Sequence, residues 1–181
     1  LQHFHIGHAP VFAQRLSYSG ELGWEIFVTP DFAEHVFEVL MEAGEAFGIR
    51  LAGAEALNAL RIEKGFLHWG HDMAYADAPH QMGLGFACKP GKPFPLVGRD
   101  AYLGRKAAEQ GPYLCFVKLD DAAPLLHHNE PVLRDGDIAG YVTSGAWSQA
   151  QGSSVGLCIL SAPEGMTSRQ ATGQGRFSVM V

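Results

Sequence analysis

The sequence holds 181 residues, of which 47% are hydrophobic and 18% are charged, and its formal net charge is −6. This balance is typical of a globular protein with enough material for one substantial core or two small ones. The acidic charge argues against nucleic acid or an anionic membrane as a partner, and no apolar run is long enough to span a bilayer.

The chain begins with a predicted hairpin. Residues 11–18 and 24–29 read as strands, the second by its alternating side chains, and Pro30 ends it. A turn at Ser19–Gly20 or at Leu22–Gly23 would join the two strands, because glycine adopts the backbone conformations that tight turns require. The chain carries no initial Met, so we expect it to be a piece of a longer protein.

Two helices are predicted after the hairpin. Asp31 and Glu34 have the spacing of a capping box, and apolar residues then recur at helical spacing until Gly48. A second helix is predicted over residues 54–64, with Gly65 at its end.

The middle of the chain is predicted to contain less regular structure. Residues 66–81 predict an irregular, histidine-rich loop, and residues 83–89 read as a short buried strand. A connector rich in Pro and Gly covers residues 90–98, and a modest helix is predicted over residues 99–110.

From Tyr113 onward the sequence predicts only strands and turns. Asp135–Gly136 is a hairpin signal between two of these strands. The fold class is therefore α+β, with an α+β segment over residues 1–110 and a small all-β segment over residues 111–181.

The three cysteines, Cys88, Cys115 and Cys158, are widely spaced and form no C-x-x-C pair. An odd number without such a pair indicates neither a disulfide framework nor a zinc site. We expect reduced, mostly buried thiols in a cytoplasmic protein.

Glu25 alternates with Trp24 and Ile26 along the second predicted strand. Taken alone, this pattern favours a carboxylate on the solvent-exposed face. The alternative is a carboxylate offered to the edge of a planar ligand, and a pterin fits because its N3–H and 2-amino group donate to one carboxylate in parallel. Tyr18, across the hairpin, could stack on such a ring or pack in the core.

The histidine-rich loop has its own alternative readings. His68 and His71 stand three residues apart beside Asp72, with His80 nearby. A metal would need three or four convergent ligands with partners of their own, and the flanking Trp, Gly and Pro residues favour a packed loop, so no metal site is predicted. The sequence also lacks the glycine-rich phosphate and dinucleotide motifs and the G-x-S-x-G motif of acyl transfer.

Several short motifs follow one another in a fixed order along the chain. They are YSGELGWEI at 18–26, LAGAEALNALRIEKG at 51–65, HWGHDM at 68–73, GLGFACK at 83–89 and VGRDA at 97–101. Together they resemble the glycine-cleavage T-protein (aminomethyltransferase) superfamily, and most closely its branch fused behind a flavin domain in dimethylglycine and sarcosine dehydrogenases. The segment at 127–160 is similar to the C-terminal β domain of that family.

The resemblance implies a fold and a domain organisation. Residues 1–110 would be the second part of the folate-binding domain, without its N-terminal half and without the acidic residue usually assigned to catalysis. Residues 111–181 would form a small antiparallel β-barrel whose last strand we expect to be incomplete. The catalytic residue is therefore left unassigned in this chain.

The resemblance also implies site residues. Glu25 matches the glutamate that holds the pterin of tetrahydrofolate, and Tyr18 matches a tyrosine that lines the same pocket. Phe86 matches a position where dehydrogenase relatives can carry a pocket tyrosine, so ring stacking would remain there without the hydroxyl. Glu21, at the turn, is then expected to have a structural or solvent-facing role.

Two positions depart from the family pattern. Glycine-cleavage T-proteins carry a folate-pocket arginine where this chain has Leu57, and the difference favours the dehydrogenase-like branch. Gln81 stands where relatives often have glutamate, so a charge is missing there.

The resemblance implies a function for the parent protein. A flavin (FAD) elsewhere in the parent would oxidise an N-methyl amine, and tetrahydrofolate bound by this segment would capture the one-carbon unit as 5,10-methylenetetrahydrofolate. This fragment alone would be inactive. The alternatives are a freestanding aminomethyltransferase or folate-dependent demethylase without flavin, and a folate-binding module that has lost its chemistry.

Overall fold

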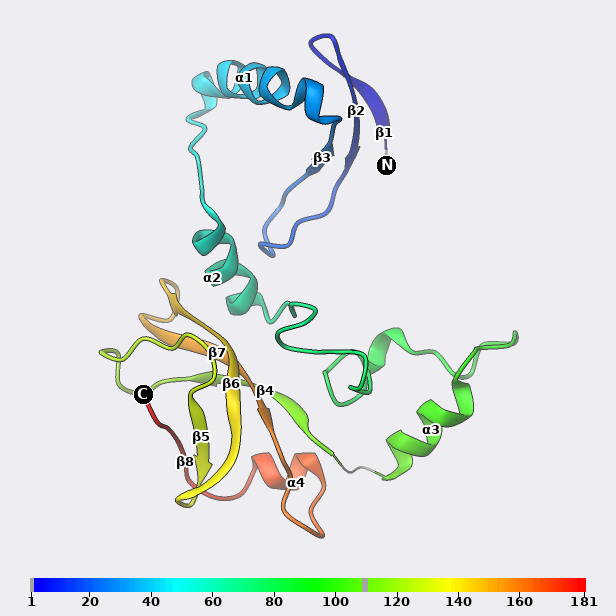
Figure 1. Cartoon of the computed structure of the whole chain (residues 1–181), viewed down its shortest axis with the longest axis vertical. Coiled ribbons are helices and arrows are strands. Elements are labelled where there is room, and N and C mark those ends of the chain that lie inside the picture. The colour runs from blue at the N-terminus through cyan, green and yellow to red at the C-terminus, as the bar shows by residue number, and fades with distance from the viewer. Residues whose placement is uncertain (1, 109–110) are drawn as a thin grey trace. The chain divides into compact units, whose positions relative to one another are not determined.

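The computed structural model of the chain describes residues 2–108 and 111–181. Its contacts divide the chain into two compact units, Leu1–Lys64 and Gly65–Val181, each with a hydrophobic cluster of its own (Figure 1). In these described ranges, no helix has both the length and the apolar content that crossing a membrane requires.

The first unit contains a three-stranded antiparallel sheet in the order β1-β2-β3. Its strands are β1 (Gln2–Ile6), β2 (Ala9–Gln14) and β3 (Glu25–Phe27). The predicted hairpin strands are thus confirmed but shorter, and β1 was not predicted. Strand β2 ends early because the N–H of Leu16 donates to the carbonyl of Gln14 at 3.0 Å, which turns the backbone away from the sheet.

Helix α1 (Ala33–Gly44) lies between two short 3₁₀ turns, η1 (Pro30–Phe32) and η2 (Glu45–Phe47). The helical segment ends at the predicted residue but in two parts, because α1 stops at Gly44 and Gly48 closes the following turn η2 in the left-handed conformation with φ of 73°. The predicted capping box is wrong, since Asp31 lies inside η1 and no side chain caps η1 or α1. Pro30 accounts for the difference, because its fixed φ starts a 3₁₀ turn ahead of the helix.

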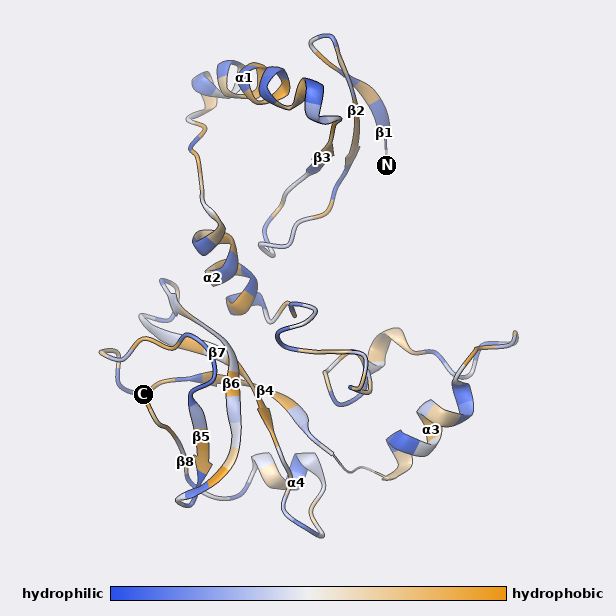
Figure 2. Cartoon of the chain, in the orientation of Figure 1, coloured by the Kyte–Doolittle hydropathy of each residue, from blue (hydrophilic) through white to orange (hydrophobic). Residues whose placement is uncertain are grey.

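One face of α1 packs against the sheet. Figure 2 shows hydrophilic and hydrophobic residues alternating around this helix. Val36 is buried against Ala9 and Val11 of β2, and Ile26 and Val28 pack against the same cluster. Side chains of β2 and β3 that alternate with these residues therefore lie on the sheet face opposite α1.

Helix α2 (Ala54–Lys64) has the predicted bounds, and Gly65 follows it with φ of 75°. Ile62 and Arg61 are buried, and the Arg61 Nε donates to Asn58 Oδ1 at 2.9 Å. The last turn of α2 also contacts the hairpin loop, because a Cβ added to Gly20 would lie 2.5 Å from Cγ of Lys64.

The second unit opens with the predicted irregular loop. The predicted buried strand at 83–89 is wrong, because these residues form a 3₁₀ turn, η3 (Gly85–Ala87). The backbone N–H groups of Ala87 and Cys88 donate to carbonyls three residues earlier and not to a neighbouring strand. Helix α3 (Arg99–Ala108) matches the predicted helix, whose last two predicted residues, 109 and 110, lie outside the described residues.

A five-stranded antiparallel sheet in the order β4-β7-β6-β5-β8 follows. Its strands are β4 (Tyr113–Lys118), β5 (Pro131–Arg134), β6 (Asp137–Ser148), β7 (Ser153–Leu160) and β8 (Phe177–Val179). The hairpin at Asp135–Gly136 is confirmed, and both residues have positive φ, as a tight turn between these strands requires.

The antiparallel sheet expected for this domain is present, but over the residues described it does not close into a barrel. Within the described ranges β4 pairs with β7 and β8 pairs with β5, and no hydrogen-bonded ladder joins β4 to β8.

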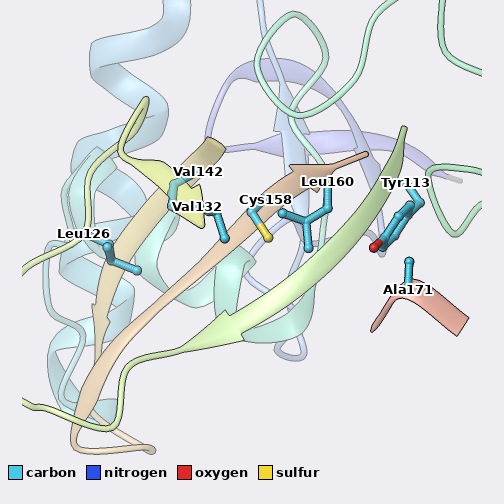
Figure 3. Close-up of a cluster of buried hydrophobic side chains, with 7 residues drawn as sticks. All are labelled: Tyr113, Leu126, Val132, Val142, Cys158, Leu160 and Ala171. Atoms are coloured by element: carbon cyan, nitrogen blue, oxygen red, sulfur yellow. The ribbon is translucent and has the colours of Figure 1, made fainter. Parts of the chain in front are cut away.

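The expectation of strands and turns alone after Tyr113 is also wrong, because a short helix, α4 (Ser168–Thr172), precedes β8. A complete capping box between Thr167 and Gln170 stabilises its first turn. Figure 3 shows Ala171 of α4 beside Tyr113, with Leu160 and Cys158 following along the same cluster of buried side chains.

Two thiols face each other in this sheet. Cys115 of β4 pairs with Cys158 of β7, and all three cysteines of the chain are free. Burial raises the pKa of the Cys115 thiol to about 11, and burial together with the neighbouring Cys115 raises the pKa of Cys158 to about 12. Both thiols are therefore neutral at physiological pH, where a thiolate would be the reactive form.

The raised thiol pKa values predict alkaline destabilisation. The folded chain keeps these protons at a pH where the unfolded chain, with an ordinary thiol pKa of 9.0, releases them. Their contribution is complete below pH 9, so we expect the free energy of unfolding to fall as the pH rises from about 9 toward 12. Urea unfolding at several pH values would show a shallower fall for Cys158→Ala than for the wild type, and equal slopes would contradict the prediction.

Candidate functional site

Glu25 lies on the open face of the three-stranded sheet. It is the first residue of β3, and the alternation of the strand directs it away from the cluster that Ile26 and Val28 join beneath α1. Its side chain is half-buried. The sequence prediction that Glu25 alternates onto the face opposite the core is confirmed.

Gln14 is the cross-strand neighbour of Glu25. The two residues are paired in the register of β2 and β3, and Nε2 of Gln14 donates to Oε2 of Glu25 at 2.9 Å. Gln14 is also half-buried, so the bond is partly shielded from water. A carboxylate has about four lone-pair sites on its two oxygens, so Glu25 keeps the capacity to accept from a ligand. Gln14 could not be identified from the sequence, because its role depends on the register of the two strands.

Aromatic rings cover the sheet beside this pair. Phe12 and Phe27 are paired two residues along the same register, with ring centroids 5.8 Å apart, and the ring of His3 lies 4.9 Å from Phe12. A shallow hollow of about 460 Å³ lies over them and extends to Thr29. The face thus combines an apolar surface with an adjacent carboxylate, an arrangement suited to a flat ring that has a polar edge.

Tyr18 lies in the loop that joins β2 to β3 and is half-buried. The loop has a defined shape, because the hydroxyls of Ser17 and Ser19 are hydrogen-bonded at 2.7 Å and Gly20 turns with φ of 74° against α2. Glu21 is exposed, and its backbone N–H lies 3.4 Å from Oγ of Ser19. Tyr18 and Glu25 therefore belong to the same unit, and their meeting around one ligand remains a prediction.

Phe86 belongs to the second unit. It lies in η3, and 79% of its surface is exposed. An exposed aromatic side chain of this kind is available to contact a ring, and its assignment to the same pocket as Glu25 remains a prediction.

The structure shows the surroundings of Gln81 and Leu57, the two residues that depart from the family pattern. Oε1 of Gln81 accepts from the N–H of Ala78 at 3.1 Å and lies 3.4 Å from Nη2 of Arg105. The neutral amide of Gln81 thus stabilises the turn that begins at Ala78. Leu57 is partly exposed on α2, with 43% of its surface accessible.

Asp72 is the most buried carboxylate described in the chain, with 1% of its surface exposed. Oδ1 accepts from the hydroxyls of Thr143 at 2.5 Å and Ser144 at 2.7 Å, and Oδ2 accepts from the backbone N–H of His68 at 2.8 Å. Asp72 therefore attaches the histidine-rich loop to β6. This role could not be identified from the sequence, because the hydroxyl partners are 71 and 72 residues away.

The histidines of this loop pack against each other. The rings of His68 and His71 are stacked, with their centroids 4.5 Å apart. Over the part of the chain that the structure describes, no three His, Cys, Asp or Glu side chains gather as metal ligands would.

Two family models match the chain. The GCVT N-terminal domain matches residues 1–92, and the glycine cleavage T-protein C-terminal barrel domain matches residues 113–179.

Similar proteins include an oxidase and a dehydrogenase. The chain is 38% identical over 149 residues to 4-methylaminobutanoate oxidase (formaldehyde-forming) of Paenarthrobacter nicotinovorans. The matched region covers 82% of this chain and 18% of that protein. It is also 38% identical over 136 residues to the mitochondrial sarcosine dehydrogenase of Homo sapiens, covering 75% of this chain and 15% of that protein. The chain thus spans less than a fifth of the length of either relative.

A solved structure shares the fold. Aminomethyltransferase T of the glycine cleavage system from Bartonella henselae superposes with a TM-score of 0.74 at 22% sequence identity, covering 83% of this chain and 42% of that one. This likeness and the two family matches confirm the α+β fold class and the resemblance stated from the motifs. The chain belongs to the glycine-cleavage T-protein (aminomethyltransferase) superfamily.

Proposed function

We propose that this chain is the tetrahydrofolate-binding portion of a dimethylglycine/sarcosine dehydrogenase-like enzyme. The observation that carries the proposal is the half-buried carboxylate of Glu25, set beside exposed aromatic rings on the open face of the sheet. Its membership of the aminomethyltransferase superfamily and its 38% identity to an oxidase and a dehydrogenase support the same conclusion.

The residues of this chain would act by binding and orienting the folate. Glu25 would accept hydrogen bonds from N3–H and the 2-amino group of the pterin, while Tyr18 would flank the ring. N5 of the folate is thereby presented to the electrophilic carbon derived from the N-methyl amine. Holding two reactants in this way is worth about 7 kcal/mol of barrier or more in the best cases.

Tetrahydrofolate, when bound, would supply N5 and N10 as the nucleophiles that take up the one-carbon unit as 5,10-methylenetetrahydrofolate. The demethylated amine would leave after accepting a proton, and a second proton would be lost on ring closure. FAD bound elsewhere in the parent would supply the preceding oxidation of the N-methyl amine. Enclosing the reaction limits the escape of formaldehyde.

Two alternatives remain distinct from this proposal. A freestanding aminomethyltransferase or folate-dependent demethylase would bind folate in the same way and contain no flavin. A non-catalytic folate-binding module would bind folate and turn over no methylamine. The oxidase and dehydrogenase relatives, of which this chain spans less than a fifth, favour the dehydrogenase-like enzyme.

The first test is the size and visible spectrum of the native full-length protein, followed by turnover of sarcosine and dimethylglycine with and without tetrahydrofolate. A long yellow protein that forms 5,10-methylenetetrahydrofolate supports the proposal. A colourless protein that transfers the one-carbon unit supports the first alternative, and folate binding without turnover of any methylamine supports the second.

We also propose a cytoplasmic location, because Cys88, Cys115 and Cys158 are all free thiols. Subcellular fractionation followed by detection with an antibody would test this location directly.

A further inference from the structure

The orientation of the Gln14 amide follows from its neighbour. The amide group that faces Oε2 of Glu25 at 2.9 Å must be the NH₂ group, because an amide oxygen there would place two acceptors against each other. An NH₂ group has two N–H bonds, and only one of them is directed at this oxygen. Gln14 therefore keeps a second donor on the same nitrogen.

The pair presents an ordered set of hydrogen-bonding groups. Gln14 and Glu25 are directly opposite each other on adjacent strands, so their polar ends lie together on the open face. Glu25 supplies acceptors, and Gln14 supplies a donor beside them. A 2-amino-4-oxo pterin has the complementary order along one edge, with an acceptor at O4, a donor at N3 and a donor at the 2-amino group.

We propose that Gln14 is a specificity-determining residue, which donates to O4 of the pterin while Glu25 accepts from N3–H and the 2-amino group. This inference rests on the proposed function, because it requires that Glu25 binds the pterin. The rings of Phe12 and Phe27 beside the pair form an apolar neighbour that shields these bonds from water.

The assignment predicts discrimination at the 4-position edge of the ligand. In a 2,4-diamino pterin an amino group replaces O4 and N3 carries no proton. Gln14 would then face a second donor, and Glu25 would lose one of the two donors that it accepts from. A site built around a hydrogen bond rejects an analogue that cannot make it far more strongly than an apolar site does. The protein should therefore prefer the 4-oxo form, and Gln14 should account for part of the preference.

The test compares two ligands that differ at the 4-substituent and in the proton on N3. Tetrahydrofolate and 4-amino-tetrahydrofolate are titrated anaerobically into the full-length protein by calorimetry. The variants are Gln14→Met, which has a side chain of similar length without the donor, and Gln2→Met, a matched control on β1 of the same sheet. Glu25→Gln is measured with both ligands as the reference for the folate site itself.

We expect the wild type and Gln2→Met to bind the 4-oxo ligand roughly tenfold more tightly than the 4-amino ligand. Gln14→Met should lower the ratio of the two affinities to the part that Glu25 accounts for, because Met has no donor to oppose the 4-amino group. A residue with a merely structural role would change both affinities together and leave this ratio unchanged.

The outcomes separate the two hypotheses. If Glu25→Gln changes neither affinity, the proposed folate site itself fails. If Glu25→Gln weakens both ligands but the ratio is the same in the wild type and Gln14→Met, the role of Gln14 alone is overturned. A ratio near one in the wild type overturns it as well, and that measurement does not depend on whether Gln14→Met folds.

Discussion

Replacing Asp72 with alanine is expected to lower the free energy of unfolding by about 3 kcal/mol. The carboxylate is buried and accepts from the hydroxyls of Thr143 and Ser144 and from the backbone N–H of His68. Removing it leaves buried donors without their acceptor and detaches the histidine-rich loop from β6. Thr143 can redirect its hydroxyl to the carbonyl of Leu157, 3.2 Å away, which limits the loss.

Urea unfolding would measure this effect, with Asp77→Ala as the matched control. Asp77 lies in the same loop and accepts from the backbone N–H of Ala74 at 2.7 Å, but this hydrogen bond is exposed, so we expect a loss below about 1 kcal/mol. Equal losses for the two variants would show that the burial of Asp72 does not increase its contribution to the free energy of unfolding.

A combined variant separates the hydrogen bonds from the packing. Asp72→Leu in the background of Thr143→Val and Ser144→Ala removes the carboxylate and its two hydroxyl partners together, so fewer buried donors are left unpaired. We expect this variant to be more stable than Asp72→Leu alone, because replacing both members of a buried polar pair costs less than removing one. A further loss of stability in the combined variant would contradict this account.

Replacing Glu25 with glutamine is expected to weaken the binding of tetrahydrofolate by about 1.5–3 kcal/mol, the range for a hydrogen bond to a charged group. The amide keeps one oxygen acceptor but brings an NH₂ donor to a pterin edge that also donates. It also brings a second amide against Gln14, whose Nε2 donates to Oε2 of Glu25 in the wild type.

Calorimetric titration of the full-length protein with tetrahydrofolate under anaerobic conditions would measure this loss. Glu21→Gln is the matched control, because Glu21 is exposed in the loop that precedes β3. We expect its affinity to match that of the wild type. Unchanged affinity in Glu25→Gln would remove Glu25 from the folate site, whereas a loss in both variants would indicate a general effect of charge.

Much of the local structure could be predicted from the sequence alone. The bounds of α2, the turn that Gly48 closes after α1 and the hairpin at Asp135–Gly136 all depend on residues a few positions apart. The alternation around Glu25 likewise determined the face of the sheet on which it lies. These features follow from helical and strand periodicity and from the backbone conformations of glycine and aspartate, which act over short distances along the chain.

Other features depended on tertiary structure, because they require groups that are distant in the sequence to meet. Strand β1 forms only by pairing with β2, and residues 83–89 form a 3₁₀ turn because their N–H groups bond locally. The open five-stranded sheet depends on which strands become hydrogen-bonded neighbours.

The candidate site shows the same division. The carboxylate of Glu25 was visible in the sequence, both as a pattern and through the family resemblance. Its partner Gln14 became apparent only from the register of β2 and β3, and the partners of Asp72 only from a contact across 71 and 72 residues. Sequence periodicity therefore determined which face each side chain occupies, and the folded path of the chain decided which polar groups lie within hydrogen-bonding distance.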